Sequence, residues 1–218
     1  RNLNRTQTHM AKSFQRLSSG LRINSGADDA AGLAISEKLK SQIRSMNQAR
    51  RNANDAVSLL QTGEGALNEV SSILTRMREL AIQSGTDTVG SVERTFINDE
   101  MTALRSEIDR LSEVTEFNGI KLIDGSATSL DFQVGLNDTA DDRIQASLLD
   151  MHSTAIGSAA AGSRLSDVNL STITGSQNAL QILDDAITDI SRGRANIGAL
   201  QNRMQTTIAN LASATENL

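Results

Sequence analysis

The 218-residue sequence contains no cysteine, no proline, no tryptophan and no tyrosine, and its only aromatic residues are four phenylalanines. Without cysteine, the chain can form no disulfide, thiolate metal site or thiolate nucleophile. Without proline, no helix is interrupted by a proline kink. No apolar run approaches the roughly 18 residues of a membrane span, so we expect no membrane insertion. The net charge of −5 argues against nucleic acid as a partner.

The sequence does have a long stripe of aliphatic and small residues. Between positions 46 and 81 they recur at alternating steps of three and four, the spacing of a helix in a left-handed bundle. We therefore expect one helix over about 29–83, roughly 80 Å long at about 1.5 Å per residue. Small residues in the stripe let helices approach closely and make a thin core, which suits a rod. The stripe comprises Met46, Ala49, Ala53, Ala56, Leu60, Gly63, Leu67, Val70, Leu74, Met77 and Ala81.

Two further helices are predicted at about 91–114 and 177–218. The second helix follows a short glycine-containing turn, so it should pack antiparallel on the end of the long helix. The last helix repeats apolar residues every seven positions, and Arg194 and Gln201 fall on its expected seam, which predicts a partly polar pairing there. The core seam is expected to consist of Leu60, Leu67, Leu74, Met77, Ile190, Ile197 and Met204.

Between these helices the pattern changes to strands and then to no regular pattern. Apolar residues alternate along 130–136 and 143–149, and Asn118-Gly119 favours a turn, so a small antiparallel sheet is expected within about 119–149. Residues 150–176 show no periodicity and are interpreted as an irregular surface segment. We separate an N-terminal helix and connector (1–28) from a rod (29–218). The expected fold is mainly α, an elongated rod of long antiparallel coiled-coil-like helices with a small antiparallel β region at one end.

No convergent set of catalytic groups is present in the sequence. His9 and His152 lie in different regions without companions at metal-ligand spacing, so we interpret both as surface residues. Pairs of adjacent acidic residues are explained by helix caps and turns. We expect no enzymatic activity, no cofactor and no metal. We therefore expect the protein to act through contacts with other molecules. Two classes of protein remain open: a subunit that polymerises side by side, or a monomeric helical binding module.

Several motifs resemble the bacterial flagellins. The resemblance is specific at LSSGLRINSGADDAAGLAISEKL (17–39), continues through RNANDAVSLLQTGEGALNEV (51–70) and RMRELAIQS (76–84), and resumes at RANIGALQNRM (194–204). It implies an extracellular, secreted subunit of the flagellar filament, with other flagellin subunits, the filament cap and the junction proteins as partners. It also implies a shaft domain that lacks most of both terminal helices, with 1–28 as the remnant of that region, and hence a monomer by itself. The related hook–filament junction protein is the alternative.

One face of the long helix is a candidate contact surface. Arg76, Leu80 and Gln83 are three or four residues apart and lie beside the seam, so we expect Leu80 to be an exposed apolar group; Glu100 of the second helix should approach the same face. From the residues alone, this is either an ordinary surface used for neighbour packing or a binding site. Flagellins that the flagellin-sensing Toll-like receptor of vertebrates detects carry Arg, Leu and Glu at positions matching Arg76, Leu80 and Glu100. The resemblance therefore implies binding to that receptor.

Overall fold

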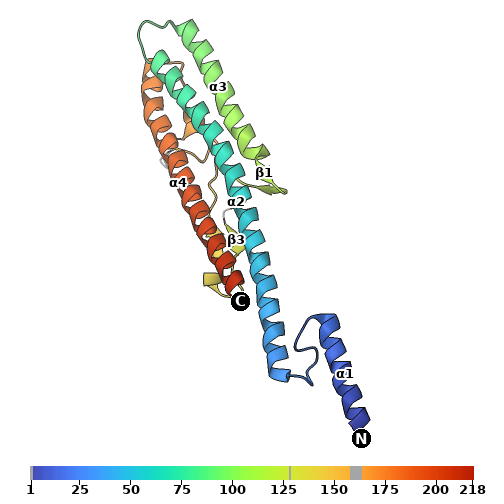
Figure 1. Cartoon of the computed structure of the whole chain (residues 1–218). Coiled ribbons are helices and arrows are strands. Elements are labelled where there is room, and N and C mark those ends of the chain that lie inside the picture. The colour runs from blue at the N-terminus through green and yellow to red at the C-terminus, as the bar shows by residue number, and fades with distance from the viewer. Residues whose placement is uncertain (1, 128, 158–163) are drawn as a thin grey trace.

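The protein is a rod built on one helix of 55 residues, α2 (Ala30–Ser84). The computed structural model describes residues 2–127, 129–157 and 164–218. Helix α3 (Ser91–Val114) folds back along the C-terminal part of α2, and α4 (Ile173–Asn217) runs antiparallel to α2 on its other side (Figure 1). The packing of α2 against α4 is the most extensive between any two elements of the described chain. The predicted mainly α, rod-like fold is confirmed.

Local sequence sets where the long helices begin and end. The carboxylate of Asp29 accepts a hydrogen bond from Gly32 N at 2.9 Å, an N-cap that starts α2. At the other end, the buried Arg94 of α3 donates to three carbonyl oxygens, those of Ser84, Thr86 and Val89. One guanidinium thus satisfies backbone groups that the end of α2 and its following turn leave unpaired.

The long helices meet along the predicted seam. The seven expected seam residues lie on α2 and α4, and each is at most 4% exposed. On α4, however, the alternate seam positions are Gly193 and Leu200, and Arg194 is exposed, so the expected polar pairing at Arg194 is wrong. The polar pairing expected at Gln201 is present, because the Gln201 side chain donates to Glu64 Oε2 of α2 at 2.9 Å. Helix α4 also begins four residues before the predicted start, because the Thr172 side chain accepts a hydrogen bond from Gly175 N at 3.0 Å.

The β region forms two separate two-stranded antiparallel sheets. In the first, β1 (Glu116–Phe117) pairs with β2 (Ile120–Lys121) around Asn118-Gly119, where φ is 51° and 77°. In the second, β3 (Leu130–Gln133) pairs with β4 (Arg143–Ala146), which follows the short helix η1 (Ala140–Asp142). The amide of Asn52 on α2 donates to the carbonyl of Gln133 at 3.0 Å and fixes the second sheet against the rod.

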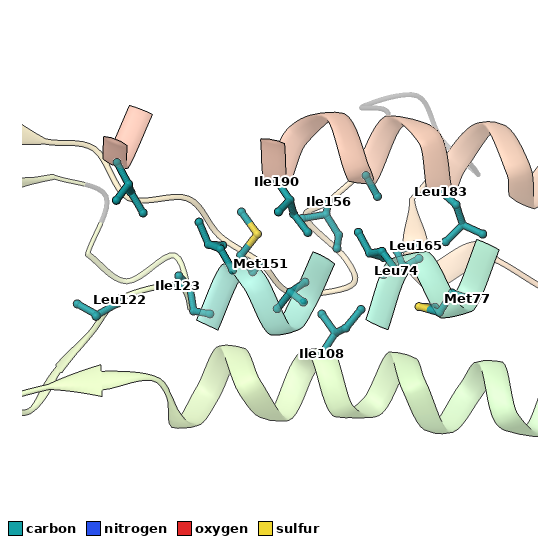
Figure 2. Packing of buried hydrophobic residues seen from close by; sticks show 14 of the residues in the cluster. Leu74, Met77, Ile108, Leu122, Ile123, Met151, Ile156, Leu165, Leu183 and Ile190 are labelled. Carbon is teal, nitrogen blue, oxygen red and sulfur yellow. The ribbon is translucent and has the colours of Figure 1, made fainter. Parts of the chain in front are cut away.

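We call residues 150–172 the strap; its described residues are irregular but do not form a surface segment, so that part of the prediction is wrong for them. Its described parts are 150–157 and 164–172, and it contains the short helix η2 (Leu165–Asp167). Figure 2 shows Met151, Ile156 and Leu165 in the space between α3 and α4. These side chains are at most 2% exposed. The described part of the strap therefore contributes buried side chains to the core between α3 and α4. Residues 158–163 lie outside the described residues.

Candidate interaction surfaces

Helix α1 (Asn2–Ser19) carries an apolar face that nothing in the described chain covers. Leu3, Met10, Phe14 and Leu17 are between 53% and 80% exposed. Their spacing of seven, four and three places them on one side of the helix. In Figure 1, α1 stands beside the first turns of α2 and away from α3 and α4. An aligned row of large exposed apolar side chains of this kind is typical of a binding surface.

The connector between α1 and α2 is held by polar contacts. Gly20 ends α1 with φ of 70°, and Asn24 donates to the Gln15 carbonyl at 3.2 Å. Lys12 Nζ lies 3.3 Å from Asp28 Oδ1, and this hydrogen bond lowers the pKa of the Asp28 carboxyl. These contacts are exposed, so each contributes little to stability, but together they set the direction of α1.

Arg76 and Glu100 meet on the outer face of the α2–α3 pair, as predicted from their positions. Arg76 Nε is 3.0 Å from Glu100 Oε1, and a second guanidinium nitrogen is 2.9 Å from Glu79 Oε2. The hydrogen bonds to Glu79 and Glu100 raise the pKa of Arg76. The ion pair to Glu100 links α2 to α3, the pair to Glu79 lies within α2, and Gln83 is exposed farther along α2.

The structure corrects the expectation for Leu80, which is 1% exposed and belongs to the hydrophobic core. The predicted seam was a single row of residues, whereas the packing of α2 against both α3 and α4 buries a wider sector that includes Leu80. Two large apolar side chains of α3 are exposed on the same side as Glu100. Val92 and Phe96 precede Glu100 by eight and four residues, which places all three on one side of the helix, and they are 61% and 67% exposed.

The opposite edge of α3 carries three polar side chains that hold the strap. The Asn98 side-chain oxygen accepts from Leu170 N at 2.8 Å, and Arg105 donates to the Ser166 carbonyl at 2.8 Å. Asp109 accepts from the backbone N and the hydroxyl of Ser153 at 2.7 and 2.9 Å. These polar residues were not predicted as a contact, although their spacing of seven and four along α3 is visible in the sequence.

His152, interpreted above as a surface residue, is instead held at the start of the strap. Its side chain is 24% exposed and contacts the carboxylates of Asp150 and Glu113. Among the described residues, no three histidine, aspartate or glutamate side chains are placed to share a metal ion. No helix in the same part of the chain is long and apolar enough to cross a membrane.

Comparisons with known proteins agree with the architecture. Residues 1–128 match the bacterial flagellin N-terminal helical region, and residues 180–218 match the bacterial flagellin C-terminal helical region. A flagellin of Halalkalibacterium halodurans is 44% identical over 217 residues, which cover 100% of this chain and 76% of the relative. A flagellin of Bacillus subtilis is 42% identical over 236 residues, with 95% and 76% covered.

Solved structures show the same relationship. The Bacillus cereus flagellin has a TM-score of 0.62 at 30% identity, covering 74% of this chain and 88% of that chain. A putative flagellar hook-associated protein from Vibrio parahaemolyticus has a TM-score of 0.70 at 14% identity, covering 89% and 100%. The likeness to the hook-associated protein concerns the fold alone. The sequence matches above 40% identity are to flagellins. The chain belongs to the bacterial flagellin family.

Proposed function

We propose that this flagellin is a secreted, extracellular subunit that assembles with copies of itself into the flagellar filament, and that α1 is a main contact surface in that assembly. The observation that supports this role for α1 is its row of exposed apolar side chains. Burying an exposed leucine or phenylalanine contributes about 1.5–3 kcal/mol. Four such residues on one helix therefore provide a large driving force for association. The filament cap and the junction proteins are the further partners that we propose, and we assign the chain no catalytic role.

A paired substitution on α1 tests the assembly surface. In bacteria whose flagellin carries Phe14→Ser together with Leu17→Ser, we expect filaments to be absent or much shorter in electron micrographs. Gln15→Ser is the matched control, because Gln15 lies between the two positions on a different side of the helix; it should leave filament length unchanged. Normal filaments in the double variant would show that the apolar face of α1 is not an assembly contact.

We further propose that the monomer binds the flagellin-sensing Toll-like receptor through the outer face of α2 and α3. This face combines an ion-paired arginine, Arg76, with the exposed aromatic side chain of Phe96. Arginine and aromatic residues dominate the energetics of protein interfaces. Glu100 and Glu79 hold the arginine in one direction, which reduces the ordering cost on binding. Leu80 lies in the core beneath this surface, so its role in the proposed binding is to pack α2 in place. Gln83 is an exposed polar side chain on the same helix.

A binding titration against the receptor ectodomain tests this second role. Arg76→Ala and Phe96→Ala should each weaken binding by about 1–3 kcal/mol. Arg192→Ala is the control, because Arg192 on α4 forms an equivalent pair with Asp189, with the charged atoms 2.9 Å apart. Leu80→Ala is not a clean probe, since it would open a cavity in the core. An absence of binding by the parent protein, or equal binding by all variants, would refute receptor recognition by this face.

A further inference from the structure

His152 lies between two carboxylates that belong to different parts of the fold. Its Nδ1 is 2.7 Å from Oδ1 of Asp150, at the start of the strap. Its Nε2 is 3.2 Å from Oε1 of Glu113, in the last turn of α3. An ionised carboxylate can only accept hydrogen bonds, and a neutral imidazole carries a single N–H donor. Only the protonated imidazolium can therefore donate to both carboxylates at once.

We propose that His152 is a proton-dependent latch that fixes the first residues of the strap to the C-terminal end of α3. When the ring is protonated, it bridges Asp150 and Glu113. When the ring loses its proton, one nitrogen becomes an acceptor that faces a carboxylate, and one of the two bonds is lost. This latch is independent of the assembly and receptor roles, because it consists of contacts within one subunit.

The surroundings of the ring are predominantly acidic. Besides the two bonded carboxylates, Asp124 in the loop after β2 acts on His152 through its charge. Asp109 on α3 lies close by, where it accepts from Ser153, the residue next to the histidine. Two cations border this region: Lys121 on β2, whose Nζ is 2.5 Å from the Glu113 carbonyl oxygen and 3.1 Å from a carboxylate oxygen of Glu116, and Arg164, which donates to the Thr154 carbonyl.

These neighbours favour the charged ring in the folded protein. The hydrogen bond to Asp150 is the main cause that raises the pKa of His152 above 6.5, partial burial opposes it, and Glu113 adds to the rise. A group whose pKa is higher in the folded than in the unfolded state stabilises the fold fully below its unfolded pKa. That contribution is lost as the pH rises through the folded value. The latch is therefore closed in mildly acidic solution and opens toward alkaline pH.

Opening should be local. Met151 remains buried and its backbone N donates to the Ile123 carbonyl at 2.8 Å, while Asp109 still binds Ser153. The segment around His152 therefore gains mobility while the other described residues of the strap stay in place. The expected signature is faster exchange at the amides of residues 152, 155 and 156, whose acceptors are the Asp150 side chain and the His152 carbonyl, with the global unfolding unit unchanged.

An NMR titration of the His152 ring in the intact chain tests the geometry. We expect the ring of the parent protein to titrate above 6.5 and the titration to move to lower pH in Glu113→Gln, whose amide replaces the charged acceptor. A parent ring that titrates at or below 6.5 would overturn the proposal, as would an identical titration in the Glu113 variant. The measurement on the parent requires no substitution, so it does not depend on how a variant folds.

Amide exchange compared at two pH values tests the consequence. At pH 6, the amides of residues 152, 155 and 156 should exchange several-fold faster in His152→Gln than in the parent, and at pH 9 the two proteins should be alike. His9→Gln is the control, because it removes the other histidine, which is exposed on α1; it should match the parent at both pH values. A difference that is equal at the two pH values, or no difference at all, contradicts a proton-dependent latch.

Discussion

The backbone carbonyl oxygen of Asn169 lies against Gly175, closer than any Cβ at that position would permit. The contact joins the end of the strap to the first turn of α4, where the Gly175 N–H also donates to Thr172. The group that excludes a side chain at position 175 is the backbone of Asn169, which cannot move aside as a flexible side chain could. The start of α4 is therefore fixed by a close approach that requires glycine.

We predict that Gly175→Ala destabilises the protein by about 1–3 kcal/mol, because the methyl group must displace the strap. Gly198→Ala on the same helix is the control, since a Cβ there meets nothing within 4 Å. This control should stabilise the protein by up to about 1 kcal/mol through helix propensity. Urea unfolding of both variants measures the difference, and two variants of equal stability would show that the close approach does not matter.

The core seam makes a second prediction. Leu67 is 1% exposed between α2 and α4, so Leu67→Ala should lower the free energy of unfolding by about 2–5 kcal/mol through lost burial and a residual cavity. Leu17→Ala on α1 is the comparison, because Leu17 is 80% exposed. Its unfolding curve should overlay that of the parent. A Leu67 variant with the same urea midpoint as the parent would show that burial along the seam does not contribute to the stability of the fold.

Arg94 makes a third prediction, for the turn between α2 and α3. Its hydrogen bonds to the carbonyls of Ser84, Thr86 and Val89 measure 2.9, 2.6 and 2.5 Å. Arg94→Lys keeps the charge but cannot reproduce the planar fork of donors, so it should cost about 2–3 kcal/mol. Hydrogen exchange should show the loss at the amides of residues 85–90. The exposed Arg110→Lys should leave both stability and exchange unchanged.

The strap makes a fourth prediction. Asp109→Ala removes two hydrogen bonds to Ser153 and should cost about 1–3 kcal/mol. The effect should appear as lost protection of the Ser153 amide, which donates to Asp109 at 2.7 Å. Asp99→Ala, on an exposed position of the same helix, is the comparison. If the Ser153 amide keeps its protection in the Asp109 variant, the polar edge of α3 does not hold the strap.

The sequence predicted the long helices well because their stability comes from a repeating apolar pattern. Leu60, Leu67 and Leu74 recur at the period of a packed helix, and such a period is visible without any knowledge of the partner. Leu80 was placed wrongly because periodicity shows one buried face, whereas the true buried sector depends on how many helices surround α2. The number of neighbours is a tertiary property that the pattern of one segment does not contain.

The strap and the His152 cluster were not predictable in the same way. Met151 and Ile156 are buried on irregular backbone and Leu165 begins the three-residue helix η2, so their spacing has no period to detect. His152 meets Glu113 only because the strap crosses the end of α3, 39 residues away in sequence. Contacts of this kind depend on how the chain returns through space. The polar spacing of Asn98, Arg105 and Asp109 was the one local hint that this edge of α3 is covered.

The proposed assembly depends on association through α1, and electron cryo-microscopy of filaments that this protein forms tests it most directly. We predict density in which Leu3, Phe14 and Leu17 of each subunit are buried against other helices, with α2, α3 and α4 packed as in the free rod. A filament in which the same three side chains face solvent would contradict the proposed assembly surface.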